Sequence, residues 1–245
     1  MLQNLKSDLR KLANSSRVLV SQRFFKTGKG EYGEGDIFLG ITVPDSRKLA
    51  IKYKELSFDE ILELLKSKIH EERLIALLIL VHNFKTGSDD IKKKIFDYYL
   101  LHTKYINNWD LVDLSADKII GEYLISVVRD LSHVENDAHF RILLNLAKSN
   151  NLWKRRIAMI ATYAWIKRGE HEITFEIAEK LIDDKHDLIQ KALGWMLREV
   201  GKRCGQEVEE QFLVAHYKQM GRTTLRYAIE HFEEKRRKEY LLGRI

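Results

Sequence analysis

The chain has 245 residues, and its 32% charged and 10% aromatic content is typical of a folded protein that can bury a full core rather than of a disordered one. Its 42 Lys and Arg exceed its 36 Asp and Glu by six, which is weak support on its own for a nucleic-acid partner. No apolar run reaches the roughly 18 residues that span a bilayer, and the N-terminal stretch lacks the apolar region of a signal peptide, so we expect no membrane association. The single cysteine, Cys204, excludes an internal disulfide and suits a reducing cytoplasm.

One proline in the whole chain favours an all-α protein, because proline interrupts helices. The apolar periodicity predicts helices at 3–13, 14–26, 44–54, 57–68, 69–85, 88–103, 108–126, 136–149, 152–168, 171–183, 185–202, 206–219 and 222–237. The predicted N-caps are Asp45 after Pro44, Ser57 with Glu60, and Asn108 ahead of Trp109. Small residues recur among large apolar ones and would let adjacent helices approach closely. We therefore predict one domain over 1–245, an all-α superhelix or solenoid of HEAT-like (ARM-like) helical repeats.

Residues 27–40 interrupt the helical pattern with five glycines. Gly28, Gly30 and Gly33 spell GxGxxG, the fingerprint of a dinucleotide site, but that fingerprint follows a strand and opens a helix. Here it follows a helical stretch, and its neighbouring acidic residues would repel a pyrophosphate. We predict a loop or short hairpin and no nucleotide cofactor.

Three tryptophans lie at nearly equal intervals, with Trp109, Trp153 and Trp195 separated by 44 and 42 residues. This interval lies in the range of HEAT and armadillo repeats, in which equivalent positions of stacked repeats can line one concave surface. Charged residues accompany each tryptophan, and the basic clusters are concentrated in the second half of the chain. The spacing predicts a functional, basic concave face.

The stretch from Trp109 places Asp113 four residues later, on the same face of the predicted helix. An isolated pair of this kind is more often a core tryptophan with an ion-paired or capping carboxylate than a functional site. The pair therefore gains weight only from its surroundings.

The helix predicted at 185–202 carries two stripes at helical spacing. One is apolar and consists of Ile189, Leu193, Met196 and Val200; the other consists of Lys191, Trp195, Arg198 and Lys202. A tryptophan within a cationic stripe is not expected in the core, and alternating aromatic and basic residues suit a phosphate backbone with a base to be stacked. The run Lys154, Arg155 and Arg156 after Trp153 adds three adjacent cations that cannot all point inward.

Other chemistries have little support. The sequence contains no HExxH, no Cys/His cluster, no GxxxxGK[ST] and no GxSxG, so we expect neither a metal site nor a cofactor. Cys204 has no recognisable His partner pattern, which argues against a catalytic thiol.

Five stretches distributed from about Arg23 to Phe232 together resemble the HEAT-like-repeat alkylpurine DNA glycosylases, the AlkD family. They are FLGITVPDSRK, NNWDLVD, LWKRRIAM, QKALGWMLREVGK and GRTTLRYAIEHF. The resemblance implies a stack of antiparallel helix pairs whose basic concave face holds duplex DNA, and excision of N-alkylated purines such as 3-methyladenine and 7-methylguanine.

Matched motif by motif, the resemblance implies that Trp109 and Trp195 are aromatic walls, Asp113 the catalytic carboxylate and Arg156 an active-site arginine. The resemblance and the basic stripes together suggest a set of positions that contact DNA. These are Phe24, Lys154, Arg155, Lys191, Arg198 and Lys202. Phe24 stands where the well-known member has a tyrosine, and residues 27–36 are an insertion relative to that member.

We therefore predict a DNA glycosylase for cationic alkylpurines that acts in base excision repair as a monomer, in the cytoplasm at the nucleoid, on double-stranded DNA containing alkylated bases. The inserted loop and Phe24 keep open a non-catalytic binder of branched or damaged DNA on the same scaffold. A protein-binding solenoid is a third reading.

Overall fold

The computed structural model describes residues 1–127 and 137–245, and in these residues the chain folds into helices without any strand. The one β-type contact within the described part is an isolated bridge between Ile37 and Ile69. The all-α prediction is confirmed. The chain divides into two compact units, Met1–Ile119 and Ile120–Ile245, each described by itself below, and the single domain over 1–245 stays a prediction.

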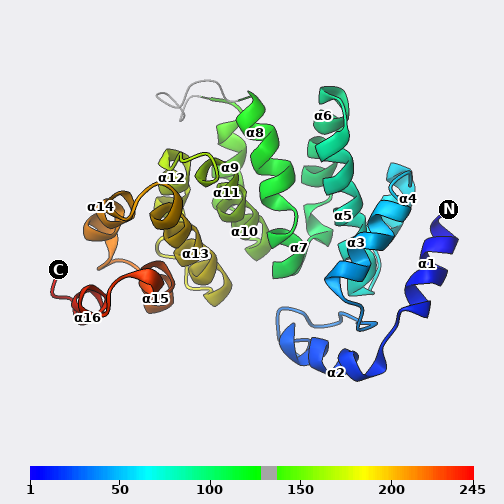
Figure 1. Ribbon diagram of the computed structural model, residues 1–245, viewed down its shortest axis with the longest axis horizontal. Helices are drawn as coiled ribbons and strands as arrows, with labels where there is room; N and C mark the ends of the chain where they lie inside the picture. The colour runs from blue at the N-terminus through cyan, green and yellow to red at the C-terminus, as the bar shows by residue number, and fades with distance from the viewer. Residues whose placement is uncertain (128–136) are drawn as a thin grey trace. The chain divides into compact units, whose positions relative to one another are not determined.

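The first unit is built around α5 (His70–Thr86), which is buried along 12 of its 17 residues. The run from Leu74 to Leu80 is apolar on all sides, and the titratable residues of the first turn are buried as well. The helix packs against the helices before and after it, which lie side by side in Figure 1. The other helices of this unit are α1 (Leu2–Lys11), α2 (Ser15–Phe24), α3 (Val43–Lys52), α4 (Phe58–Leu65), α6 (Asp89–Leu101) and α7 (Trp109–Asp113), with a 3₁₀ turn at Thr103–Tyr105. Helix α5 is thus the common support for α3, α4, α6 and α7.

The second unit shows the stacking expected of helical repeats: α9 packs on α12, α10 on α13, and α13 on α15. Each helix therefore contacts its counterpart in the next pair, as in HEAT-like arrays. Its helices are α8 (Glu122–Val127), α9 (Phe140–Ala147), α10 (Leu152–Ala161), α11 (Tyr163–Ile166), α12 (Glu172–Leu181), α13 (Asp187–Arg203), α14 (Gln206–His216), α15 (Arg222–Ala228) and α16 (Glu234–Leu242), with a 3₁₀ turn at Ile229–His231.

Helix α13 is the longest of this unit and lies very close to α15. A Cβ atom added at Gly194 would lie 2.4 Å from the Thr224 carbonyl oxygen and 2.5 Å from the Tyr227 Cβ. Only hydrogen fits there, so the glycine fixes how α13 is turned toward α15.

Two of the three predicted caps are confirmed. Ser57 and Glu60 form a reciprocal capping box at α4, and the Asn108 side chain accepts a hydrogen bond from the Trp109 backbone at the start of α7. The prediction for Asp45 is wrong because α3 begins earlier, with Thr42 as its N-cap accepting from the Asp45 backbone.

Two long predicted helices are interrupted at a buried hydroxyl residue. In the predicted 108–126 helix, α7 ends at Asp113 and a π-helical turn follows at Asp117–Gly121; between them the Ser115 hydroxyl donates to the Leu111 carbonyl at 2.6 Å. In the predicted 152–168 helix, Thr162 separates α10 from α11 and its hydroxyl donates to the Met159 carbonyl at 2.8 Å. Both hydroxyls bond the backbone a turn earlier, which disturbs the regular helical ladder.

The predicted 222–237 helix is also wrong, because it covers parts of two helices. After the 3₁₀ turn, Phe232 adopts an extended backbone, and α16 then begins at Glu234 and runs to Leu242. The Phe232 side chain is buried against Tyr240, with ring centroids 5.9 Å apart. The break thus coincides with burial of this ring and contains no proline or glycine.

Candidate functional site

Helix α7 is a single turn that presents Trp109 and Asp113 at its two ends. Leu111 and Val112, between them, are fully buried and anchor the turn. Trp109 and Asp113 are both half-buried, so each side chain keeps part of its surface open. The predicted i, i+4 pairing on one helical turn is confirmed; the roles of the two residues stay predictions.

The Trp109 indole belongs to a cluster of aromatic rings in the first unit. It stacks on Phe25 with centroids 5.2 Å apart and planes 15° apart, and meets Phe24 edge-on at 5.4 Å. Phe25 stacks in turn on Phe38 at 4.9 Å. Phe24 is 62% exposed, so this cluster reaches the surface beside Trp109 at the position where we predicted a DNA contact.

Asp113 lies near a buried hydroxyl pair. Tyr99 is fully buried and shares a 2.8 Å hydrogen bond with Ser115, two residues after Asp113. Burial raises the pKa of Tyr99 far above its usual value, and the charges of Asp117 and Asp113 add to that effect. Tyr99 therefore stays protonated. Of the two acidic residues of α7, Asp110 is buried and Asp113 is half open to solvent.

The two stripes predicted on the 185–202 helix exist in the second unit. The apolar residues Ile189, Leu193, Met196 and Val200 are buried on α13. The residues of the other stripe, Lys191, Trp195, Arg198 and Lys202, are half-buried or exposed. Trp195 lies beside Tyr163 with ring centroids 6.3 Å apart. The prediction that Trp195 lies outside the core is confirmed.

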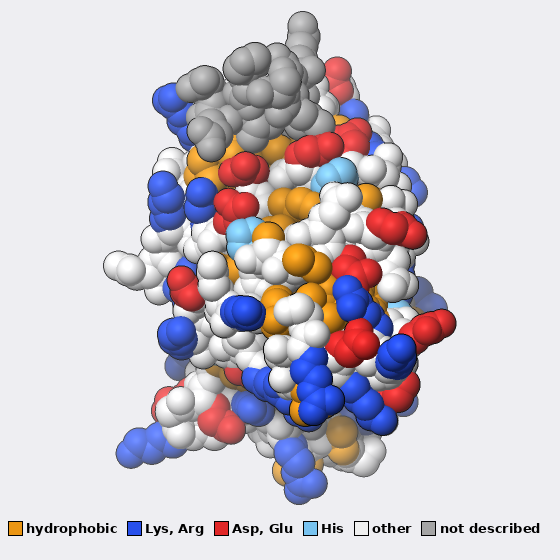
Figure 2. All heavy atoms as spheres, turned by 90° about the vertical axis from the view of Figure 1, so that its left-hand side faces the viewer, with side chains coloured by type: hydrophobic (Ala, Val, Ile, Leu, Met, Phe, Trp, Pro, Cys, Tyr) orange, Lys and Arg blue, Asp and Glu red, His pale blue; other side chains and the backbone are white. Residues whose placement is uncertain are grey.

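Most of the predicted DNA-contacting cations are already bound by carboxylates of the protein. The pairs are Arg155 with Asp184 at 2.6 Å, Lys191 with Asp187 at 2.7 Å, Lys202 with Glu199 at 3.3 Å, and Arg198 with Glu230. Lys154 has no ion-pair partner among residues 1–127 and 137–245. Figure 2 shows one face of the molecule, on which Lys and Arg side chains stand beside Asp and Glu side chains. A phosphate would therefore compete with internal carboxylates for these cations.

The stretch after Trp153 is more deeply buried than expected. Trp153 is 8% exposed and belongs to the core, so the expectation that three indoles share a surface is wrong for this residue. Trp153 lies on α10, a helix that packs against both α9 and α13. Arg156 is also buried, and its guanidinium donates to the Leu188 carbonyl at the start of α13. Its predicted role toward DNA stays a prediction.

The model of one protein family, described as "DNA alkylation repair enzyme", matches residues 5–232 of this chain. The chain belongs to the DNA alkylation repair enzyme family. Among solved structures, the chain is similar to a protein described as "Predicted DNA alkylation repair enzyme from Enterococcus faecalis", with a TM-score of 0.66, 16% identity, and coverage of 91% of this chain and 97% of that one. It is also similar to AlkD2 from Streptococcus mutans, with a TM-score of 0.56, 15% identity, and coverage of 94% and 99%. At these identities the structures support the helical-repeat fold, and no curated protein matches the chain significantly.

In this alkylation repair family member, the glycine-rich segment 27–40 is a series of turns, and the prediction of a loop is confirmed. The Glu31 carboxylate accepts from the Gly28 amide, and the Glu34 carboxylate accepts from the Gly30 amide, both at 2.8 Å. Those amides are the groups with which a phosphate-binding loop would hold its ligand. In this segment the amides bind acidic side chains of the same segment, where a phosphate-binding loop would bind phosphate.

Sequence patterns missed three residues that support the candidate site. Phe25 stacks on Trp109, and His70 packs on Phe25 behind it. Tyr163 lies beside Trp195 and accepts a 2.9 Å hydrogen bond from Arg203. For Phe25, a signal was present in the sequence, because two aromatic residues, Phe24 and Phe25, stand together just before the loop. Nothing in the local pattern distinguishes His70 or Tyr163, because their partners lie far away in sequence.

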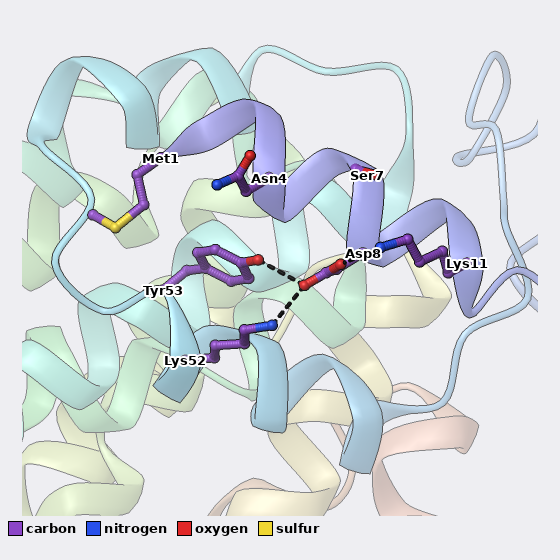
Figure 3. Close-up of a pocket in the computed structure, with 7 residues that line it drawn as sticks. All are labelled: Met1, Asn4, Ser7, Asp8, Lys11, Lys52 and Tyr53. Atoms are coloured by element: carbon purple, nitrogen blue, oxygen red, sulfur yellow. Dashed lines mark hydrogen bonds and ion pairs between the residues drawn. The ribbon is translucent and has the colours of Figure 1, made fainter.

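A hollow of about 470 Å³ between α1 and α3 contains none of the predicted site residues (Figure 3). Its central carboxylate, Asp8, accepts from Lys52 and from the Tyr53 hydroxyl, each at 2.7 Å. Hydrogen bonds from Lys52, Tyr53 and Lys11 hold the pKa of Asp8 well below its usual range. The charged groups of this hollow are thus paired with one another, and it adds nothing to the candidate site.

Within the described residues, no group of His, Cys, Asp and Glu side chains has an arrangement that could hold a metal ion. In the same part of the chain, no helix is long and apolar enough to cross a membrane.

Proposed function

We propose that this protein is a DNA glycosylase that excises N-alkylated, positively charged purines of the 3-methyladenine and 7-methylguanine type from duplex DNA. The proposal refines the family assignment to one reaction and one substrate class. In this role the protein acts on alkylated double-stranded DNA as a monomer, without a cofactor, in the cytoplasm at the nucleoid.

The observation that supports the proposal best is the composition of α7, where a half-open indole and a half-open carboxylate flank a single buried turn. The indole face attracts a cationic purine through cation–π interaction, worth about 0.5–2 kcal/mol. The carboxylate, one turn away, suits the positive charge that develops on the sugar when that purine leaves.

The chemistry requires little acid catalysis. An alkylated purine already carries a positive charge, so the C1′–N9 bond breaks with its electron pair moving to the base, which leaves neutral. The sugar becomes oxocarbenium-like, as in glycoside hydrolysis. Asp113 stabilises that charge and orients a water molecule; the water adds to C1′ and releases its proton to the carboxylate or to solvent.

The resemblance to the family implies further residues for this function, and most of these belong to the second unit. Trp195 serves as the second aromatic wall, and Lys191, Arg198 and Lys202 contact phosphates that flank the lesion. Arg156 acts near the lesion, and a phosphate there would share its guanidinium with the Leu188 carbonyl. Phe24, Lys154 and Arg155 contribute further backbone contacts.

Base release from defined DNA tests the proposal. Duplex DNA containing 7-methylguanine is incubated with the protein, and free base is quantified by chromatography with mass detection. We expect release by the wild type and a loss of about 10²-fold or more in Asp113→Asn, because the variant keeps the shape of the side chain and removes its charge. Asp97→Asn, on the exposed side of α6, is the control for a change in net charge.

Tight DNA binding by the wild type without any base release would contradict the glycosylase proposal. If junction DNA were then preferred over linear duplex, and deletion of residues 28–35 abolished that preference while Asp113→Asn did not, the non-catalytic binder would replace it.

A further inference from the structure

A buried histidine lies between two carboxylates, one on α7 and one in segment 27–40. His70, the first residue of α5, is 2% exposed. Its Nε2 atom lies 2.7 Å from Asp110 Oδ2, and its Nδ1 atom lies 3.3 Å from Asp36 Oδ2. Asp110 is the neighbour of Trp109 on α7, and Asp36 belongs to the glycine-rich segment. The imidazole therefore joins three parts of the first unit: α5, α7 and the inserted segment.

The same imidazole is packed among the rings that support Trp109. It stacks on Phe38 with centroids 4.6 Å apart and lies 4.9 Å from Phe25, the ring on which Trp109 stacks. Trp109 is thus connected to His70 by two routes, one through the backbone beside Asp110 and one through the Phe25 ring.

The charges around His70 are balanced. Asp36 also accepts from Arg73 at 2.7 Å and from the Asn108 side chain at 3.3 Å. The nearby Glu71 carboxylate is taken up by the backbone amides of residues 39–41. Two carboxylates, Asp36 and Asp110, thus face two cationic groups, Arg73 and the imidazole of His70, provided that the imidazole carries both of its protons.

We propose that His70 is a positioning residue of the candidate site, which acts as an imidazolium that donates to Asp110 and Asp36 together and so fixes α7 with Trp109 and Asp113. This inference rests on the proposed function for its effect on base release, but not for its effect on Trp109 itself. A neutral imidazole has one N–H and could donate to only one of the two carboxylates.

The protonation state agrees with this role. Burial works to lower the pKa of His70, and so does the charge of Arg73, whose Nη2 atom lies 3.4 Å from His70 Nδ1. The charge of Asp110 and the hydrogen bonds to Asp110 and Asp36 outweigh both effects and raise the pKa to about 9. Burial likewise works to raise the pKa of Asp36, and the hydrogen bond from His70 with the charge of Arg73 lowers it overall. At neutral pH both partners are therefore charged.

Nuclear magnetic resonance of the free wild-type protein tests the inference without any DNA. With nitrogen-labelled histidine, we expect both His70 ring nitrogens to be protonated at pH 7.5 and to titrate near pH 9. The Trp109 indole N–H signal, assigned by its loss in Trp109→Phe, should change over the same pH range. A His70 ring that is neutral at pH 7.5 would overturn the proposal.

Variants separate positioning from simple stability. In His70→Gln, which keeps polar contacts but no charge, we expect the Trp109 signal to lose its alkaline transition and base release to fall about 10-fold or more, with the DNA concentration for half-maximal rate changed less than about 2-fold. His70→Arg, a cation with several donors, should recover most of the lost rate. His82→Gln, on the same helix, is the matched control and should behave as the wild type.

The outcomes distinguish the two proposals. If the wild type releases no base, the glycosylase function fails, while the two resonance measurements still decide the role of His70. If His70→Gln folds, keeps the wild-type titration of Trp109 and releases base at the wild-type rate, the role of His70 is wrong and the glycosylase function stands.

Discussion

Single residues of the candidate DNA-contacting face are held by internal carboxylates before any DNA arrives. Arg198 is bound by Glu230, which lies on the 3₁₀ turn after α15 and is itself about half exposed. DNA binding at this position exchanges one anionic partner for another, and the strength of the internal pair therefore reduces the gain in affinity.

Removal of the internal partner should tighten DNA binding. We expect Glu230→Gln to lower the dissociation constant for undamaged duplex by about 2- to 5-fold at low salt, since a partly exposed ion pair is worth about 0.2–1 kcal/mol. Fluorescence anisotropy with labelled duplex measures the change. Glu233→Gln removes the same charge from an exposed position near Glu230 without releasing Arg198, so an equal gain in that variant would show that only net charge matters.

The sequence could separate these residues from the core but could not pair them. Helical spacing alone indicated that Trp195 and Arg198 lie on a different face from Leu193 and Met196, and the burial of α13 agrees. The partner Glu230 follows Arg198 by 32 residues on another element, and such a contact depends on tertiary packing. The burial of Trp153 was missed for the same reason, because the sequence pattern around it does not reveal which helices pack against α10.

Glu209 is a second residue whose state depends on burial. It is 2% exposed on α14, and one of its carboxylate oxygens has no hydrogen-bond partner among the described residues. Burial, with the nearby charge of Glu210, raises its pKa to about 8. The folded protein therefore keeps a proton on Glu209 that the unfolded chain releases at lower pH.

Glu209→Gln should remove a loss of stability that grows with pH. Because the folded pKa is raised above the unfolded value, the folded state binds the extra proton between about pH 4.5 and 8, and the wild type loses stability as pH rises through that range. Urea denaturation measures the free energy of unfolding of the variant and of the wild type at each pH. We expect the difference between the two proteins to be larger at pH 8 than at pH 5, by about 2 kcal/mol in favour of the variant. Glu207→Gln, exposed on the same helix, should show no such difference.

Secondary-structure elements were predictable where a local signal marks their ends. Ser57 with Glu60 and Asn108 ahead of Trp109 identify their helices because capping needs only neighbouring residues. The interruptions at Ser115 and Thr162 were missed, since both residues are tolerated within helices and act here through buried hydroxyl contacts. The break at Phe232 was also missed, and the ring that contacts Phe232, Tyr240, belongs to the next helix.

The contact of α13 with α15 should be intolerant of a single methyl group. We expect Gly194→Ala to lower the free energy of unfolding by about 1–3 kcal/mol, because the new Cβ would overlap the Thr224 carbonyl and helices must separate to admit it. Thermal and chemical denaturation measure the loss. Lys191→Ala, on the half-exposed face of the same helix, is the control, and an equally stable Gly194→Ala protein would contradict the close approach.

For the whole molecule, the raised pKa values of His70 and Glu209 act in the same direction. His70, with a folded pKa of about 9 against a usual 6.5, contributes stability that is complete below pH 6.5 and is lost as pH rises through 9. Glu209 adds a decline that begins near pH 4.5. Both groups bind more protons in the folded state than in the unfolded state over their ranges.

The free energy of unfolding should therefore fall from mildly acidic to alkaline pH. We expect a decrease of about 3 kcal/mol or more between pH 5.5 and 9.5, measured by urea denaturation at constant ionic strength. The double variant His70→Gln, Glu209→Gln should show a decrease that is smaller by at least half. A wild type that becomes more stable toward pH 9.5 would contradict both protonation states.

The fold class and the family could be predicted because their signals are distributed along the chain. The single proline and the long apolar periodicities indicated an all-α protein, and the motifs around Trp109, Arg156 and Trp195 indicated the family whose model matches residues 5–232. The support around Trp109 could not be predicted, since Asp36 and Phe38 belong to segment 27–40 and His70 begins α5, both far from Trp109 in the sequence. Only folding brings those side chains into contact.

The glycine at position 194 also limits how this protein can diversify. No side chain larger than hydrogen fits between α13 and α15 at this position. We therefore expect related sequences to keep glycine there and to vary at the outward positions of the same helix or in the loops. In a library randomised at residues 191, 194 and 202 and selected only for folded protein, we expect glycine to persist at 194 while the other two positions diverge. The rotation of the helix is inherited, and its outward chemistry is free to evolve.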